Sequence, residues 1–280
     1  AASMGRLNDL FDIAPAISDS GTTRSLQHVS GTIEFNNVSF KYPETSRHVL
    51  TNVSFQIKPG QTVAIVGGTA SGKSSLAQLI PRLYDVSEGT IKIDGVDIRE
   101  FRLAELRNAI AFVPQEPFLF SMRLRRNIEL QNLQGKPGTV ASRELERALQ
   151  VSQLAKTLPV LPEGIDTRLG ERGINLSGGQ KQRATLARAI YRDAPILILD
   201  DALSSVDSET ETAILSALRE YMTERTSIIV SHRVSAVREA DLILVLEDGL
   251  LVEHGVDPHA AGEEELDDGQ VAVAHAEVEG

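Results

Sequence analysis

The stretch GGTASGKS, residues 67–74, constrains this chain more than any other part of its sequence. It follows the apolar run TVAIV and precedes SLAQLIPRLY, so a β-branched strand enters and a helical pattern leaves. This is a full match to the phosphate-binding pattern GxxxxGK[ST]. Gly67 and Gly72 let backbone N–H groups face inward, Lys73 adds charge for the outer phosphates, and Ser74 offers a hydroxyl to Mg²⁺. An ordinary glycine-rich turn is the alternative, but strand, loop and helix together favour nucleotide binding.

Composition adds few constraints. The chain has 280 residues, no cysteine and a net charge of -11. Without thiols it has no disulfide or thiolate metal site, which fits a reducing compartment. The negative charge is concentrated after residue 256, in a stretch that contains eight acidic residues and no Lys or Arg. In the rest of the chain, 31 acidic residues nearly balance 28 basic ones. We therefore expect no nucleic-acid partner, which would require a basic face. The longest apolar runs, 196–199 and 242–246, are strand-sized, and no signal peptide is evident.

The order of patterns predicts one α/β core with additions. Residues 1–30 combine a helical stretch with a polar linker, and residues 116–176 read as an inserted helical subdomain with a Gly/Pro break at 135–138. Residues 256–280 lack periodicity, and we expect disorder there. Strands alternate with helical patterns elsewhere, including a helix at 103–108, which predicts a mostly parallel sheet. The expected strands are 32–40, 49–57, 62–66, 90–95, 109–115, 195–200, 227–232 and 241–249.

Two further stretches have the character of phosphate sites. Asp200 ends the apolar run ILIL, which places a carboxylate suited to Mg²⁺ at the tip of a buried strand. LSGGQ, residues 176–180, precedes a helical pattern. Ser177 and Gln180 have the spacing of a capping box, but two adjacent glycines begin a helix at a cost unless another group approaches the backbone. Such a helix start forms a second anion site, which suggests two nucleotides shared across a dimer.

These motifs resemble the nucleotide-binding domain of an ATP-binding cassette (ABC) transporter from about residue 31 to 255. LSGGQ is similar to that family's signature, which binds ATP held by the opposite subunit. The resemblance implies a P-loop α/β fold with an antiparallel β subdomain and an inserted α-helical subdomain, using ATP and Mg²⁺. It also implies that Tyr42 stacks on adenine, although a half-buried aromatic at a strand end is the alternative. His232 would contact the γ-phosphate, and Gln115 would touch Mg²⁺ and the transmembrane partner.

The resemblance assigns these site residues as three sets. The nucleotide-binding set from the chain's own loop is Tyr42, Gly67, Gly68, Thr69, Ala70, Ser71, Gly72, Lys73, Ser74 and Ser75. The set that reaches across the dimer is Ser177, Gly178, Gly179, Gln180 and Asp207, the last in the stretch SSVD. The metal set is Ser74, Gln115 and Asp200, and the catalytic set is Asp201, His232 and Gln115.

Other features favour an exporter. TRLGERG, residues 167–173, resembles the exporter-type loop TEVGERG with Glu171 at its acidic position, and the opening AASMGRLNDLFD resembles the chain leaving a last transmembrane helix. We therefore expect a fragment, itself soluble, of a half-transporter at the cytoplasmic face of the inner membrane, with a transmembrane domain in the same full-length chain. The mixed apolar and basic stretch 117–126 suits a partner groove, or else ordinary core plus a solvated helix. The transported substrate is not encoded here.

The sequence departs from the family at two positions. The residue after Asp200 is Asp201, where a fully active site has Glu. The carboxylate of Asp, one methylene shorter, lies about 1 Å or more from the position where the Glu carboxylate would act. Loss of general-base catalysis lowers the rate of hydrolysis about 10²- to 10⁴-fold. We therefore expect slow hydrolysis at this site and a heterodimer with a Glu-bearing subunit; a homodimer using a relayed water is the alternative. Ala70 replaces a common Gly, costing roughly 1 kcal/mol if φ is positive there.

Two rival classes share part of this pattern. A soluble ABC protein acting on nucleic acid or ribosomes would use the same motifs but would be expected to have a coiled-coil insertion or tandem cassettes. A P-loop kinase or GTPase would have Lys73 and Asp200 without LSGGQ or the switch histidine. The sequence favours the exporter over both.

Overall fold

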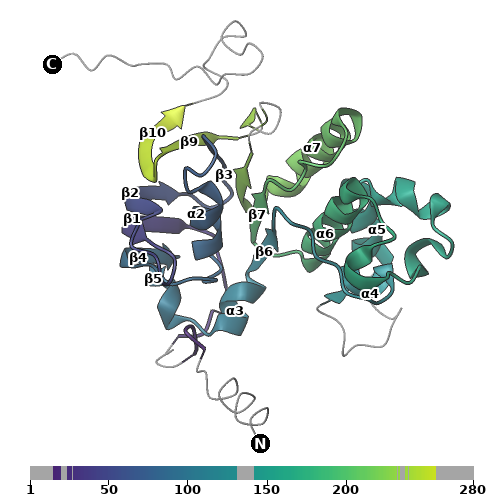
Figure 1. Ribbon diagram of the computed structural model, residues 1–280, viewed down its shortest axis with the longest axis horizontal. Coiled ribbons are helices and arrows are strands. Elements are labelled where there is room, and N and C mark those ends of the chain that lie inside the picture. Colours follow the sequence, from purple (N-terminus) through teal and green to yellow (C-terminus); the bar gives the residue numbers. More distant parts are fainter. Residues whose placement is uncertain are drawn as a thin grey trace, which may run out of the picture.

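The computed structural model describes residues 15–19, 24–26, 28–130, 142–231, 233, 237–238 and 240–256. The described chain forms two β-sheets and a group of helices (Figure 1), with the strand orders β2-β1-β4-β5 and β10-β9-β3-β8-β7-β6. The strands are β1 (Ile33–Phe40), β2 (Leu50–Ile57), β3 (Thr62–Gly67), β4 (Glu88–Ile93), β5 (Val96–Asp97), β6 (Ile110–Val113), β7 (Ile196–Asp200), β8 (Thr226–Val230), β9 (Leu242–Glu247) and β10 (Leu250–Val256). The α-helices are α2 (Lys73–Leu79), α3 (Leu103–Asn108), α4 (Leu124–Ile128), α5 (Ser142–Val151), α6 (Gly178–Arg192) and α7 (Ser208–Met222).

The larger sheet carries the site. Its central strands β3, β7 and β8 are buried along almost their whole length, as continuous apolar runs require when both faces of a sheet are covered. β6, β7, β8, β3 and β9 pair in parallel, which confirms the predicted mostly parallel sheet. Parallel strands have their carboxyl ends at the same edge of a sheet. Gly67 at the end of β3 and Asp200 at the end of β7 therefore both lie at the carboxyl edge of this sheet.

The smaller sheet is antiparallel, as predicted for the N-terminal strands. The helix α2 packs with both sheets, and Leu76 and Leu79 of this helix share one apolar cluster with Ile33 of β1 and Ile65 of β3 (Figure 1). All four side chains are fully buried. The phosphate loop and its helix are therefore held between two sheets rather than on the outside of one.

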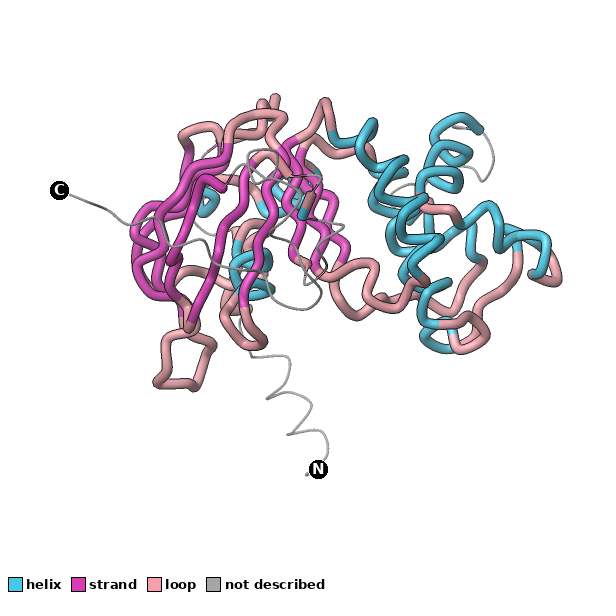
Figure 2. Tube along the Cα trace, turned by 90° about the horizontal axis from the view of Figure 1, so that it is seen from above, coloured by secondary structure: helices cyan, strands magenta, loops and turns pink. Residues whose placement is uncertain are grey.

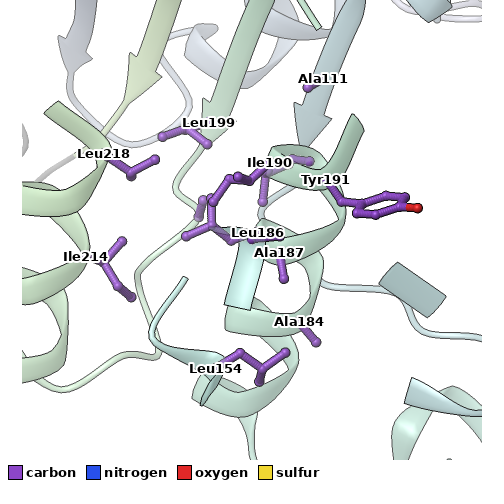
Figure 3. Close-up of a cluster of buried hydrophobic side chains, with 14 of the residues drawn as sticks. Ala111, Leu154, Ala184, Leu186, Ala187, Ile190, Tyr191, Leu199, Ile214 and Leu218 are labelled. Atoms are coloured by element: carbon purple, nitrogen blue, oxygen red, sulfur yellow. The ribbon is translucent and has the colours of Figure 1, made fainter. Parts of the chain in front are cut away.

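The helices α4, α5 and α6 lie together beyond the β6 edge of the larger sheet (Figures 1 and 2). Figure 3 shows the core that they share with the sheet, where Leu186 and Ile190 of α6 pack near Leu154, Leu199 and Leu218. The helix α6 begins after the predicted insert of residues 116–176, yet it packs against α4 and α5. Contiguity in sequence did not indicate this partnership, because α6 also reaches back to the sheet.

The sequence did not predict β10. It pairs antiparallel with β9 at the edge of the larger sheet, with two irregularities in register between Leu251 and Glu253 and between His254 and Val256. The stretch LLVEHGV lacks strict alternation, and an edge strand with bulges needs none. The assignment of 241–249 as one strand is corrected to β9 followed by a turn at Asp248 and Gly249, both with positive φ.

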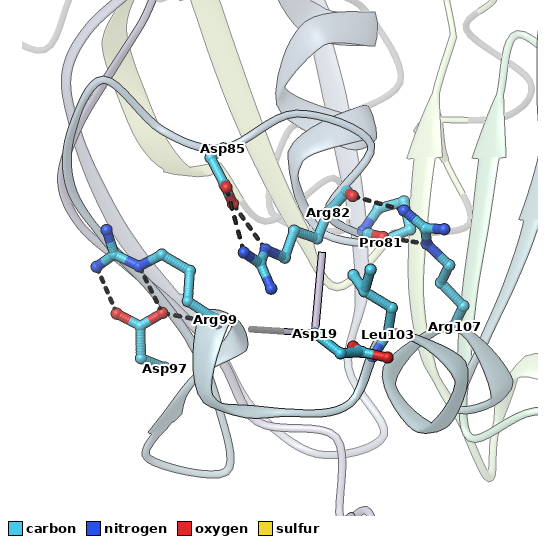
Figure 4. A network of polar contacts seen from close by, with 8 residues as sticks. All are labelled: Asp19, Pro81, Arg82, Asp85, Asp97, Arg99, Leu103 and Arg107. Carbon is cyan, nitrogen blue, oxygen red and sulfur yellow. Dashed lines mark hydrogen bonds and ion pairs between the residues drawn. The ribbon is translucent and has the colours of Figure 1, made fainter. Parts of the chain in front are cut away.

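Polar contacts fasten the segment before β1 to the core. Asp94 accepts hydrogen bonds from the backbone N–H groups of residues 30–32, and Asp19 accepts one from the N–H of Leu103 at 2.7 Å. Nearby, Arg107 donates to the carbonyl groups of Pro81 and Arg82 (Figure 4). The end of α2, the start of α3 and the incoming chain thus form one polar network.

Some expectations concern residues outside those described: the helical stretch at the start of the chain, the break at 135–138 and the acidic tail from residue 257. In the part of the chain that the structure describes, no helix combines the length and apolarity needed to cross a membrane.

Two glycines with similar backbones test how closely β1 and β4 must approach. Gly89 (φ 81) faces a bulge in β1, and an added Cβ would come 2.3 Å from the carbonyl oxygen of Asn37, whereas Gly95 (φ 78) has open space. We predict that Gly95→Ala costs about 1 kcal/mol of unfolding free energy from backbone strain alone. Gly89→Ala should cost about 2–4 kcal/mol, since a backbone clash is added. Urea denaturation measures both, and equal losses would contradict the packing argument.

Candidate nucleotide-binding site

The loop between β3 and α2 has a backbone that only small residues permit. Gly67 has φ 146, and a Cβ there would come 2.0 Å from the carbonyl oxygen of Leu246 in β9. Gly72 has φ 103, and a Cβ there would come 2.9 Å from the carbonyl oxygen of Val49. Ala70 also has a positive φ of 64, so the strain anticipated for an alanine there is present. No side chain caps the first turn of α2, which leaves its N–H groups directed toward the loop.

Lys73 curls back over this loop. Its Nζ donates to the carbonyl oxygens of Gly67 at 2.9 Å and Gly68 at 2.7 Å and lies 3.4 Å from Ser71 Oγ. Burial lowers the pKa of the Lys73 ammonium, although the carboxylates of Asp201 and Asp200 act in the opposite direction. The ammonium is therefore held at the loop centre by weak carbonyl acceptors, for which phosphate oxygens are a stronger replacement.

Asp200 and Ser74 are in direct contact where β7 ends and α2 begins. Ser74 Oγ donates to Asp200 Oδ1 at 2.8 Å, while Asp200 Oδ2 is buried and has no hydrogen-bond partner in the described protein. Burial raises the pKa of Asp200; the Ser74 hydrogen bond opposes the rise, and the neighbouring Asp201 carboxylate adds to it. An unpartnered carboxylate oxygen beside a hydroxyl is a donor set that fits Mg²⁺. Since no group of three acidic, His or Cys side chains gathers in the described residues, phosphate and water would complete the coordination.

Gln115 and Asp201 face this centre. Asp201 adopts a left-handed backbone (φ 47), and its N–H donates to the carbonyl oxygen of Val230 at 2.9 Å, which fixes the residue against β8. Gln115 Nε2 approaches Asp201 Oδ2 at 3.4 Å, a long contact. Four of the five predicted catalytic and metal residues therefore lie together, namely Ser74, Gln115, Asp200 and Asp201, while His232 lies outside the described residues.

A cleft of about 490 Å³ connects these groups with Tyr42. Tyr42 hydroxyl is 2.8 Å from Ser75 Oγ, and its ring packs edge-on against Phe40 and Tyr84. The half-buried alternative for Tyr42 is thus correct as a description, and the ring still borders the cleft. The lining residues are Tyr42, Arg47, His48, Val49, Thr69, Ala70, Ser71, Gly72, Lys73, Ser74, Ser75, Gln115, Asp201 and Asp248.

Four of these lining residues were not found from the sequence. Arg47, His48 and Val49 lie in the loop after Tyr42 and match no motif, although their closeness to Tyr42 in sequence was a signal. Asp248 lies in the turn between β9 and β10, where Gly249 donates from its N–H to the carbonyl oxygen of Ser71 at 3.2 Å. Nothing local to Asp248 indicates a site, because only sheet pairing carries that turn to the phosphate loop.

The predicted signature residues lie elsewhere. Ser177 Oγ accepts a hydrogen bond from the Gln180 N–H at 3.3 Å, and Gln180 Oε1 accepts one from the Ser177 N–H at 2.9 Å. These two residues therefore form the capping box at the start of α6 that their spacing predicted. A Cβ on Gly179 would come 2.8 Å from the carbonyl oxygen of Ser205. The glycine therefore also serves the packing of this helix start against the loop before α7. Among the described residues that line the cleft, none belongs to 177–180.

Asp207 caps the helix that follows. Its side chain accepts from the Thr210 N–H at 2.9 Å at the start of α7, and these hydrogen bonds lower the pKa of Asp207. Asp207 is exposed and does not line the cleft. Lys73 and Ser177 thus belong to two separate surfaces of one chain.

Three features together define a nucleotide-binding ATPase domain. They are the phosphate loop, the buried Asp200 carboxylate whose donor set fits Mg²⁺, and the separate glycine-rich start of α6. The chain belongs to the ABC transporter family, whose pattern matches residues 50–204. The match confirms the family and the fold class expected from the sequence.

Particular relatives narrow the relationship. The chain is 45% identical over 240 residues to the ATP-dependent lipid A-core flippase of Pseudomonas aeruginosa, covering 86% of this chain and 39% of that protein. It is 44% identical over 232 residues to the same kind of flippase from Coxiella burnetii, covering 83% and 39%. A solved bacterial Atm1-family ABC exporter with ATP bound matches with a TM-score of 0.82 and 38% identity, covering 90% and 43%. The chain therefore spans about two fifths of the length of these relatives.

Asp200→Asn tests the electrostatics of the metal centre. We predict that it stabilises the unliganded domain at neutral pH by on the order of 1 kcal/mol, because a buried carboxylate becomes neutral. The folded-state pKa of Asp200 lies above its unfolded value, so the carboxylate is unfavourable above that raised pKa. The gain should shrink as pH falls toward the unfolded pKa of about 3.9. Urea unfolding at several pH values measures it.

Asp97→Asn is the matched control for this measurement. Burial opposes ionisation of Asp97, but hydrogen bonds from Arg99 outweigh it and hold the pKa of Asp97 below its usual value. This substitution should therefore cost stability at neutral pH, and the loss should fade as pH falls through the depressed pKa. Two variants that shift stability in the same direction at pH 7 would contradict the assignment of Asp200.

Proposed function

We propose that this chain is the ATP-hydrolysing motor of an ABC exporter, which closes head to tail with a second cassette around ATP. The observation that carries the proposal is the separation, within one chain, of the cleft lined by Lys73 and Ser74 from the helix start at Ser177. Each surface has the chemistry of a phosphate site, but one chain does not bring them to one nucleotide. A second cassette would supply the missing half of each site.

The residues of the cleft have distinct tasks in this proposal. Lys73 exchanges its carbonyl acceptors for phosphate oxygens, and the N–H groups of the loop and of α2 face the phosphates. Ser74 and Asp200 would hold Mg²⁺, which neutralises charge on the phosphates when bound. Gln115, which lines the cleft, would touch Mg²⁺ and the transmembrane partner, and Tyr42, which also lines it, would stack on the base. His232 is proposed as the γ-phosphate contact.

The weakened site is part of the proposal. The backbone of Asp201 is fixed by its bond to β8, so the reach of its carboxylate is limited by the length of its side chain, one methylene shorter than that of Glu. We therefore assign slow hydrolysis to this site and a Glu-bearing second subunit to the other, in a heterodimer. A homodimer in which Asp201 acts through a water is the competing assembly.

The proposed link to the membrane lies beside Gln115. Phe118 and Phe120 are exposed, with 47% and 41% of their surface accessible, and their rings pack edge to face 5.0 Å apart. Arg188 of α6 fixes this segment by donating to the carbonyl oxygen of Phe118 at 3.0 Å and to that of Asn127 at 2.7 Å. Exposed aromatic rings on a rigid support suit a partner helix.

The remaining organisation follows from that assignment. Residues 1–30 would continue from a transmembrane domain, residues 31–255 form the cassette with residues 116–176 as its helical subdomain, and residues 256–280 form an acidic tail. The motor would act at the cytoplasmic face of the inner membrane. The flippases that this chain resembles are named for lipid A-core, and the substrate here would be chosen by the transmembrane part.

Asp201→Glu tests the weakened site. We predict that it raises ATP turnover of the purified chain at least about tenfold, as expected when part of a 10²- to 10⁴-fold general-base contribution is recovered. Asp201→Asn is the control and should change turnover little. If the wild type already matches the Glu variant and the Asn variant loses activity, Asp201 is the working base and the weak-site assignment is wrong. Phosphate release at saturating MgATP measures both.

The native full-length protein provides a second test. We predict that it sediments with membranes and copurifies with a second cassette polypeptide that has Glu at the position of Asp201. A soluble ABC ATPase would remain in the supernatant and associate with ribosomes or nucleic acid instead. Recovery of a single cassette type from the membrane would support the homodimer.

A further inference from the structure

Four segments of the chain meet in a polar cluster beside α6, the helix that begins after Ser177 and is called the signature helix below. They are α6, the loop 201–207, the first turns of α7 and the residue that follows His232. Gln182 of α6, 1% exposed, donates from Nε2 to Ser204 Oγ at 2.8 Å and accepts from the Ser205 N–H at 2.8 Å. Both ends of this amide are thus used to hold the loop against the helix that Ser177 begins.

Arg233 ties the same loop to β8 and α7. It forms an ion pair with Glu211, and its Nη2 donates to the carbonyl oxygen of Ser204 at 3.1 Å. Its backbone N–H donates to Ser231 Oγ at 3.0 Å. Glu211 is only 4% exposed, so its carboxylate depends on such partners. One guanidinium therefore contacts a buried helix carboxylate and a loop carbonyl at once, which a lysine ammonium does less well.

The position of Arg233 makes this contact relevant to catalysis. Arg233 directly follows His232, and on the other side Ser231 donates from its N–H to the carbonyl oxygen of Ile65. Arg233 does not line the nucleotide cleft. Instead it borders a small cavity together with Asp201, Ser204 and Glu211. The cluster and Asp201 therefore border the same small cavity.

We propose that Arg233 is a positioning residue that couples the loop 201–207, and through Gln182 the signature helix, to the backbone that carries His232. The inference rests on the proposed function, in which Ser177 and Asp207 meet the nucleotide of the other subunit. Docking of that nucleotide would fix α6 and the loop, and Arg233 would then fix the chain at Ser231, the residue that precedes His232 in the sequence.

The experiment compares the wild type with Arg233→Lys, Arg233→Ala, Glu211→Gln and the double variant Arg233→Ala/Glu211→Gln. We expect kcat for ATP to fall roughly tenfold to a hundredfold, as for a small misplacement of a catalytic group, with KM for ATP nearly unchanged. The double variant should be no worse than the poorer single variant, because both act through one contact. Full kcat in both Arg233 variants, or additive losses, would overturn the inference.

Arg225→Lys is the matched control for a purely structural effect. Arg225 is more enclosed than Arg233, with 10% of its side chain exposed against 36%, and it pairs with Asp193 at 2.6 Å and donates to the carbonyl oxygen of Tyr221 at 2.7 Å. It should lower the unfolding temperature at least as much as Arg233→Lys does while leaving kcat intact. Equal loss of kcat in this control would assign the effect of Arg233 to stability and overturn the inference.

Binding of MgATP by the wild type separates this inference from the proposed function. A wild type that binds and hydrolyses ATP, alongside Arg233 variants with unchanged kcat, overturns only the role of Arg233. A wild type that does not bind MgATP overturns the proposed function and the inference that rests on it. Calorimetric titration with MgATP and phosphate release distinguish the two results.

Discussion

The approach of the phosphate loop to the β9 backbone is the contact on which the site depends. Gly67 leaves β3 so close to the carbonyl oxygen of Leu246 that no Cβ fits, and the chain must turn there with φ 146. This turn directs the loop across the carboxyl edge of the sheet, where Asp200 ends β7. It also brings the β9–β10 turn against Ser71, which adds Asp248 to the cleft. Sheet pairing and ligand chemistry therefore share one constraint.

Burial of opposite charges is the second organising feature. Lys73 and Asp200 are both buried. Burial lowers the pKa of Lys73 and raises the pKa of Asp200, so it favours the neutral form of each group. Neither group has an ideal partner inside the protein, since Lys73 contacts carbonyls and Asp200 keeps one unpaired oxygen. In the proposed function, phosphate would supply the missing partner of Lys73 and Mg²⁺ that of Asp200. We expect the unliganded site to be less stable than a neutral one, as where function sets the residues.

Polar side chains organise both the start of α6 and the loop that packs against it. Ser177 and Gln180 cap α6, Gly179 admits the Ser205 backbone, and Gln182 holds the next loop. A capping box and a phosphate-binding surface are therefore compatible descriptions of one helix start, because the cap uses only part of its N–H groups. The helix that begins at this surface is joined to the 201–207 loop by two hydrogen bonds of 2.8 Å through Gln182.

The sequence alone determined the family, the mostly parallel sheet and the groups at Lys73, Ser74 and Asp200, because strand, loop and helix are local patterns with fixed spacing. It also indicated that Ser177 belongs to a different surface from Lys73. Only the tertiary structure decided that α6 joins the helical layer, that β10 forms an edge strand, and that Asp248 and Arg233 reach their sites. These features arise from pairing between segments far apart in the chain, and such pairing leaves no periodic signal in either segment.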